Sequence, residues 1–194
     1  MWNNFKYLVM EIKITTNQIL KVLEILSWII FIGLCVEAGG IIVNTFISLF
    51  INPDGVENFW KGKEYLSSLY QYDYGYFMVV AIIMCIVAIL KAIMFYLIIK
   101  LFLNKNLDFY NPFSLELKQF ISKLSYLALG IGLFSISGDK YSEFVSKQGL
   151  QAVNLQLLNL EGADVWLFMA VILFIISYVV KKGIEIQTEN DLAI

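Results

Sequence analysis

The sequence predicts an all-α integral membrane protein in which four transmembrane helices form a bundle. Of the 194 residues, 59% are hydrophobic and only 15% are charged, and the mean hydropathy is +0.73. Soluble domains are about 45–50% apolar and about 25% charged, so the excess apolar surface must face lipid rather than water. The apolar residues are gathered into four long runs, and most lysines lie in the segments on one side of those runs.

The four apolar runs define the predicted spans, at about residues 25–51, 77–103, 120–138 and 163–180. A membrane-spanning helix needs about 20 residues at 1.5 Å per residue. The first two runs are long enough to span with tilt. The last two are shorter, and we expect lysines at their ends to extend toward the interface. The whole chain, residues 1–194, is therefore predicted to be a single membrane domain.

Lysine placement predicts the topology, because cytoplasmic loops are enriched in basic residues. All 14 basic residues are lysine, and nine of them lie before the first run, around the connection between the second and third runs, or after the fourth. We therefore expect both termini in the cytoplasm, two extracytoplasmic loops of about 25 residues each, and a cytoplasmic tail at residues 181–194. Residues 1–24 do not resemble a cleaved signal peptide and are interpreted as an interfacial segment.

Both outer loops contain patterns that fit more than one structure. The first loop, about residues 52–76, carries Trp60 and five tyrosines, which fit either an aromatic belt at the interface or a surface that stacks on a ligand. In the second loop, residues 153–157 alternate apolar and polar side chains before a one-residue slip. This pattern fits either a bulged β-strand or an amphipathic helix on the membrane.

Glu37 and Lys91 are charged residues near the middle of the first and second spans. An uncompensated charge at the bilayer centre costs about 2.5 to more than 10 kcal/mol, depending on how it is measured. Since these two spans form an antiparallel hairpin, their midpoints lie at one depth, and we expect a Glu37–Lys91 ion pair. The pair fits two roles: a structural lock that fixes helix pairing, or a site that relays protons or ions or switches the packing.

Small and polar residues at helical spacing predict a narrow polar seam around this pair. Small residues let helices approach closely, and polar residues find partners there. The predicted seam residues are Gly33, Gly40 and Asn44 in the first span and Ser125, Gly132 and Ser135 in the third.

The sequence contains no recognisable catalytic or metal-binding pattern. It has no His, and its two cysteines, Cys35 and Cys85, each lie alone in an apolar run. Without His the commonest general base and zinc ligand are missing, and two isolated thiols do not make a metal site. We therefore expect no enzymatic activity, no cofactor and no bound metal. Direct nucleic-acid binding is not expected of a chain with this composition and a net charge of −2.

The C-terminal residues carry a resemblance to a known family. The matching residues are Gly183, Glu185, Gln187, Glu189, Asn190, Asp191 and Leu192. This ending resembles that of bacterial membrane proteins classed as domain of unknown function 2975. Residues 111–114, Asn-Pro-Phe-Ser, are a second and weaker resemblance. The chain departs from the family at Ala193, where Thr is usual, and at Ile194, which replaces Val.

The resemblance implies a four-span protein of the bacterial inner membrane with no established enzymatic activity. It also implies a regulatory or sensory partner of a cytoplasmic helix-turn-helix transcription factor, with the tail as the docking element. From the residues alone, Glu185 and Glu189 fit either a solvated face or a docking surface for a basic partner. The alternative function is a small oligomeric transporter or channel that uses the Glu37–Lys91 pair, although four spans leave little room for a pore in one chain.

Overall fold

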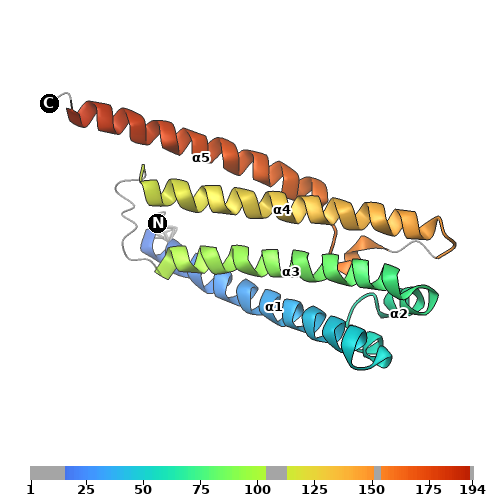
Figure 1. Cartoon of the computed structure of the whole chain (residues 1–194). Coiled ribbons are helices and arrows are strands. Elements are labelled where there is room, and N and C mark those ends of the chain that lie inside the picture. Colours follow the sequence, from blue (N-terminus) through green and yellow to red (C-terminus); the bar gives the residue numbers. More distant parts are fainter. Residues whose placement is uncertain (1–15, 104–112, 151–153, 193–194) are drawn as a thin grey trace, which may run out of the picture.

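The computed structural model describes residues 16–103, 113–150 and 154–192, and all its regular elements are helical (Figure 1). In chain order they are α1 (Thr16–Phe50), η1 (Pro53–Asn58), α2 (Lys63–Tyr72), α3 (Tyr74–Leu103), α4 (Leu115–Ser146), η2 (Leu155–Leu158) and α5 (Ala163–Leu192), where η marks a 3-10 helix. Within the described residues, α1, α3, α4 and α5 are long and apolar enough to cross a membrane. The prediction of an all-helical chain with four such helices is confirmed.

The four long helices pack side by side in the order α1, α3, α4, α5 (Figure 1). Each packs mainly on its neighbour in this order, so α1 and α5 lie at the two edges. The helices therefore form an open row. Within the described residues, α1 and α5 are not in extensive contact with each other. The start of α1 and the end of α5 lie at the same end of the row.

The helices extend beyond the predicted spans. α4 continues to Ser146, well past residue 138, and α5 continues past residue 180 to Leu192. Residues 16–24 of the predicted interfacial segment already belong to α1 and are continuous with the first long helix, and residues 1–15 lie outside the described residues. Hydropathy marks only the apolar part of a helix, whereas backbone hydrogen bonding continues through polar turns.

Local signals explain where these helices begin. Ser114 is the N-cap of α4, and its Oγ accepts a hydrogen bond from the backbone N–H of Leu117. Asp73 separates α2 from α3, and its Oδ1 accepts from the backbone N–H of Tyr76. Gly62 precedes α2 with a φ of 66°, a conformation that glycine adopts readily because it has no Cβ.

In the described part of the second outer loop, the alternating pattern forms neither a β-strand nor an α-helix. Its described part forms the 3-10 helix η2, which begins after Asn154, whose Oδ1 accepts from the backbone N–H of Gln156. Leu158 and Leu160 are fully buried, while Gln156 is exposed. Within the alternating pattern Leu155 is half-buried and Leu157 is exposed, so the alternation does not mark the residues that enter the core.

The first outer loop is mostly helical, and its aromatic side chains divide between two environments. Tyr65, Tyr70 and Tyr76 pack against the core. Trp60 and Tyr72 are exposed. Neither the aromatic belt nor the stacking surface accounts for all of these residues.

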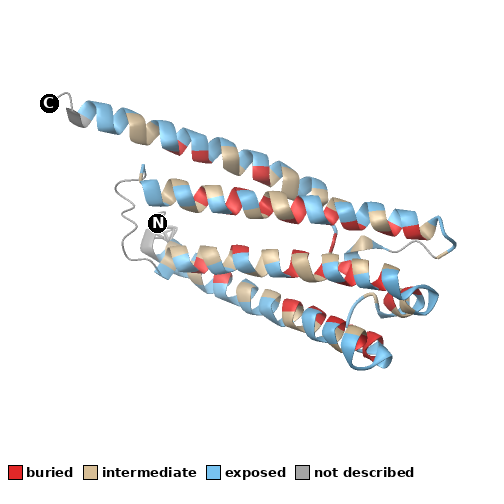
Figure 2. Cartoon of the chain, in the orientation of Figure 1, coloured by how far each residue is buried: buried red, intermediate tan, exposed pale blue. Residues whose placement is uncertain are grey.

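Figure 2 shows buried residues along the length of α3 and α4, whereas α1 and α5 are exposed over much of their length. We call residues 38–84 and 138–160 the loop half, and the remaining described residues the membrane half. Most of the largest fully buried side chains belong to the loop half, namely Leu66, Leu69, Phe77, Val80, Val145, Leu158 and Leu160. In contrast, the most apolar stretch of α1 is only 6% buried and that of α5 is 17% buried.

Candidate functional site

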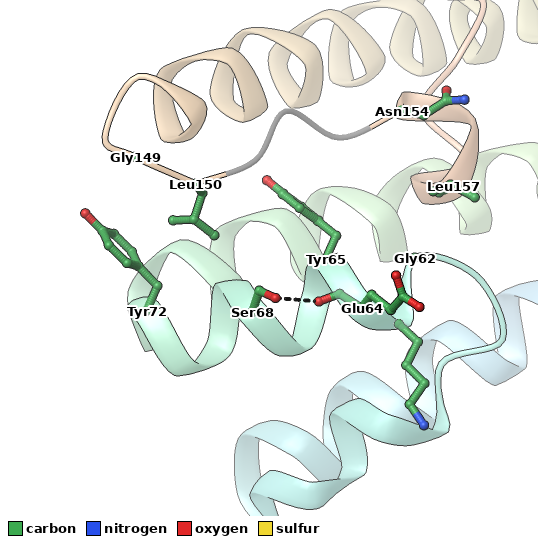
Figure 3. A pocket seen from close by; sticks show the side chains of 10 residues that line it. Gly62, Glu64, Tyr65, Ser68, Tyr72, Gly149, Leu150, Asn154 and Leu157 are labelled. Carbon is green, nitrogen blue, oxygen red and sulfur yellow. Dashed lines mark hydrogen bonds between the residues drawn. The ribbon is translucent and has the colours of Figure 1, made fainter.

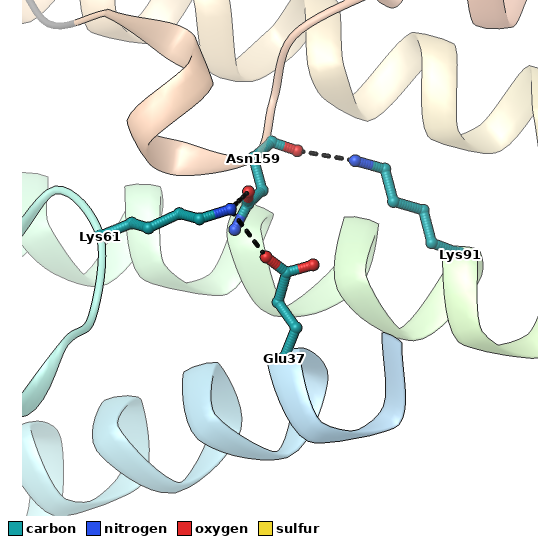
Figure 4. Close-up of polar contacts among 4 residues, drawn as sticks. All are labelled: Glu37, Lys61, Lys91 and Asn159. Atoms are coloured by element: carbon teal, nitrogen blue, oxygen red, sulfur yellow. Dashed lines mark hydrogen bonds and ion pairs between the residues drawn. The ribbon is translucent and has the colours of Figure 1, made fainter. Parts of the chain in front are cut away.

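Four polar residues converge beside α1 and α3, and we call them the polar cluster: Glu37, Lys61, Lys91 and Asn159 (Figure 4). The Nζ atom of Lys61 lies 3.2 Å from Glu37 Oε1 and 3.1 Å from Asn159 Oδ1. The Nζ atom of Lys91 donates to the backbone carbonyl of Asn159 at 2.9 Å. The polar cluster therefore holds both outer loops against α1 and α3.

The direct Glu37–Lys91 ion pair expected from the sequence does not form among the described residues. Glu37 pairs with Lys61, and Lys91 binds a carbonyl, so Asn159 stands between the two expected partners. Lys91 also lies over the ring of Trp166, 5.8 Å from the ring centroid, which is within cation–π range. The two charges do share one site, but loop atoms connect them.

Asn159 links the two lysines because of its backbone conformation. Its φ is 57°, in the left-handed region that asparagine enters more readily than most residues. This conformation ends η2 and directs the side-chain oxygen toward Lys61 while the backbone carbonyl faces Lys91. Sequence reasoning missed Asn159 and Lys61 because both lie in loops.

A tight turn after α1 sends the chain back along that helix. Asn52 Oδ1 accepts from the backbone N–H of Asp54, and Pro53 begins η1. Gly55 is buried against α1, where an added Cβ would lie 2.7 Å from Ile47 Cγ2. Only glycine fits this close approach, so this position fixes the path of the returning chain.

The returning chain is then bound to α1 at two points. Asn44 Nδ2 donates to the backbone carbonyl of Asn58 at 2.9 Å. The ring of Trp60 covers Gly40, 3.6 Å from where a Cβ would lie. Lys61 follows Trp60 directly, so these contacts bring its ammonium group to the carboxylate of α1.

A cavity of about 40 Å³ lies beside the polar cluster and is lined by Glu37, Lys61, Asn159, Trp60 and Met84, among others. A cavity of this size has room for one or two waters beside the polar groups of the cluster. The side chains of Glu37 and Lys61 are 32% and 55% exposed. The polar cluster can therefore exchange protons with water, but its cavity is too small to enclose an organic substrate.

The residues of the predicted polar seam do not form one seam. On α1, Gly40 and Asn44 are covered by the first loop, and an added Cβ at Gly33 would meet nothing within 4 Å. On α4, Gly132 packs against Leu167 of α5. Because α3 lies between α1 and α4 in the row, the two stripes cannot face each other.

The serines of the predicted seam belong to the α4–α5 side of the row. Ser125 Oγ donates to the backbone carbonyl of Ser122. Ser135 is fully buried, and its Oγ has no hydrogen-bond partner among the described residues. The hydroxyls of Ser122 and Ser177 lie 2.6 Å apart and join α4 to α5.

A larger cavity of about 790 Å³ lies between α2 and the chain that leads to η2 (Figure 3). Its lining includes Tyr65, Tyr72 and Leu150, so two tyrosines of the aromatic loop reach it. Burial raises the pKa of the Tyr65 hydroxyl, and the nearby Ser142 hydroxyl partly offsets this effect, although neither has a partner in full hydrogen-bonding geometry among the described residues.

The two segments that carry the family resemblance contact each other. Phe113, just before α4, packs against Gly183 of α5, where an added Cβ would overlap the phenyl ring. This contact needs glycine at position 183. Gly183 is half-buried and one side of it is covered by its own chain.

The tail residues beyond Gly183 differ in their accessibility. Glu185 pairs with Lys182 at 2.6 Å and with Lys181 at 3.7 Å. The outward residues are Gln187, Glu189 and Asn190, all exposed, and the side chains of Asp191 and Leu192 lie outside the described residues. Of the two tail acids singled out above, Glu189 is the one that forms no ion pair among the described residues.

No group of three or more His, Cys, Asp or Glu residues in the described part of the chain could hold a metal ion. No protein-family model matches the chain, and neither a curated protein nor a solved structure shows significant similarity to it. The family resemblance of the C-terminal residues stays a prediction.

Proposed function

We propose that this chain is a non-enzymatic regulatory or sensory protein of the bacterial inner membrane, a partner of a cytoplasmic helix-turn-helix transcription factor. The observation that carries the proposal is α5, an unbroken helix from Ala163 to Leu192. It begins just after Asn159, where both outer loops meet in the polar cluster, and it ends in the tail. One rigid element therefore connects the loops to the tail.

Contacts along α5 support this coupling. The Ser122–Ser177 hydrogen bond fixes α5 against α4, and Phe113 against Gly183 fixes the point where the tail begins. A shift of Asn159 would move the start of α5, and a continuous helix passes such a shift to its far end. In the proposed mechanism the outer loops receive the signal, and the tail passes it to the partner.

The tail offers a small surface of mixed chemistry to a partner. Ile186 is 59% exposed, and Gln187, Glu189 and Asn190 are exposed near it. One unpaired acid, two amides and one apolar side chain suit a partner with a basic, partly apolar face. Lysines lie near the start of α1 and at the beginning of the tail, and this enrichment favours a cytoplasmic position for the tail surface.

The alternative, a small oligomeric transporter or channel, has less support. The cavity beside the polar cluster holds one or two waters, and both lysines of the cluster are bound to loop atoms. A transport path would require these contacts to break or further copies of the chain to join. The proposed regulatory function requires neither broken contacts in the cluster nor further copies of the chain.

The test is crosslinking in the native cells, followed by mild-detergent purification of the tagged chain and mass spectrometry. Four forms are compared: the full chain, a chain truncated after Gly183, Glu189→Lys, and the matched control Glu143→Lys. Glu143 is an exposed acid at the opposite end of the row. We expect a helix-turn-helix protein to co-purify with the full chain and the control, to be lost on truncation and to be reduced in Glu189→Lys. Recovery of known membrane complexes without any such protein would overturn the proposal.

A further inference from the structure

Contacts of the polar cluster and its neighbours mark one height along the row of four long helices, and we call this height the level of the polar cluster. Glu37 of α1 and Met84 of α3 line the same small cavity. Gly138 of α4 packs against Leu160 and Ile83, so α4 and the start of α5 reach this level too. The boundary between the loop half and the membrane half lies here.

Below this level, each long helix has a mainly apolar stretch of similar length, interrupted by Glu24 in α1 and by Lys91 in α3. Counted from Glu37, Met84, Gly138 and Ala163, the lysines Lys21, Lys100, Lys123 and Lys181 lie 16, 16, 15 and 18 residues away, which is about 22–27 Å of helix. The hydrocarbon core of a bilayer is about 30 Å thick, and lysine side chains extend beyond their backbone positions. With the lysine side chains extended toward the opposite interface, the membrane half approaches this thickness.

At this level the chain has features that lipid does not tolerate. The chain is not helical between Phe59 and Gly62, and non-helical backbone is excluded from contact with hydrocarbon. Glu37 and Lys61 are partly exposed here. Trp60 is 73% exposed at the same place, and tryptophan is enriched at membrane–water interfaces.

We propose that one surface of the bilayer lies at the level of the polar cluster, so that the loop half stands outside the lipid as a folded cap. Lipid headgroups then contact Trp60, Lys61 and Glu37. The backbone of Lys91 lies within the lipid, and its side chain extends to the Asn159 carbonyl at the boundary. This placement does not rest on the proposed function, and it moves Glu37 from the bilayer centre to the interface.

One feature of α1 opposes this placement. Val43, Phe46 and Phe50 lie above the level and are 55%, 56% and 73% exposed, although all three are apolar. In the cap they stand in water as an apolar strip, and soluble proteins carry patches of a few hundred Å². Labelling of a cysteine at position 46 is therefore the strictest check of this placement.

The test measures labelling by a membrane-impermeant maleimide in proteoliposomes that have been frozen and thawed, so that reagent reaches both faces. The background replaces both native thiols, as Cys35→Ala and Cys85→Ala. Single cysteines are placed at exposed positions, and each of three helices carries one pair. In each pair the first position belongs to the loop half and the second to the membrane half. The pairs are Phe46→Cys and Ile29→Cys on α1, Met78→Cys and Ile93→Cys on α3, and Phe144→Cys and Leu133→Cys on α4. Glu57→Cys in η1 is the positive control.

We expect each loop-half cysteine to react at least about tenfold faster than its match, because hydrocarbon excludes the reagent and water does not. The placement is overturned if any loop-half cysteine reacts as slowly as its membrane-half match. Each variant must elute like the parent chain and label fully in denaturing detergent. If Phe46→Cys does not fold, Val43→Cys replaces it.

Discussion

The loop half and the membrane half are built from the same long helices but are stabilised in different ways. In the loop half, α2, η1 and η2 enclose a core with fully buried side chains such as Leu66 and Phe77. In the membrane half, many large apolar side chains of α1 and α5 point outward, and α4 meets α5 at small or hydroxyl residues such as Gly132 and Ser177, although α3 and α4 also bury Val87 and Ile131. If the loop half lies outside the lipid, as proposed above, water drives the first kind of packing, whereas close approach and hydrogen bonds must supply the second in lipid.

The largest expected effect comes from emptying the core of the loop half. Phe77 is fully buried, so Phe77→Ala should lower the free energy of unfolding by about 3–5 kcal/mol. Phe168 of α5 is 68% exposed, so Phe168→Ala should change it by less than about 0.5 kcal/mol. Reversible unfolding in mild detergent measures both. Equal losses would show that the burial of Phe77 and the exposure of Phe168 do not decide their contributions to stability.

A second comparison uses two glycines of the membrane half. Gly183→Ala should cost about 1–3 kcal/mol, because the new methyl group overlaps the Phe113 ring. Gly33→Ala should stabilise α1 by about 0.5–1 kcal/mol, because a Cβ there meets nothing within 4 Å. Thermal unfolding gives both values. The double variant Phe113→Ala, Gly183→Ala should recover part of the loss, and no recovery would rule out the ring contact as the cause.

The smallest expected effect is the one that bears most directly on where the bilayer lies. In a double-mutant cycle of Glu37→Gln and Lys61→Met, we expect a coupling free energy below about 1 kcal/mol, because exposed ion pairs contribute little. Breaking a pair buried in a low-dielectric environment would cost about 3–5 kcal/mol. Unfolding in bicelles supplies the measurement. A coupling in the higher range would put the pair inside the lipid.

The sequence was sufficient to predict the four long helices, because each must cover itself with apolar side chains where it meets lipid. It was not sufficient for their order in the row, since lipid-facing and helix-facing residues are both apolar. The resemblance singled out Phe113 and Gly183 separately, and the structure brings them into contact. Neither hydropathy nor spacing could have paired them.

The polar cluster was predictable only in part. Glu37 and Lys91 stood out because a charge in an apolar run is costly, and both do belong to the cluster. Lys61 and Asn159 had no comparable signal. The Asn-Pro-Asp-Gly turn at residues 52–55 indicates that the chain reverses, but the distance it returns along α1 depends on side-chain contacts such as Trp60 on Gly40.

The polar cluster also has an order of assembly during protein synthesis. Asn159 lies 98 residues after Lys61 and 68 residues after Lys91, so it leaves the ribosome long after both lysines. Until then Glu37 and Lys61 can already meet, whereas the carbonyl that binds Lys91 does not yet exist. A nascent chain that ends before η2 therefore carries an ammonium group without this acceptor, which distinguishes it chemically from the finished protein.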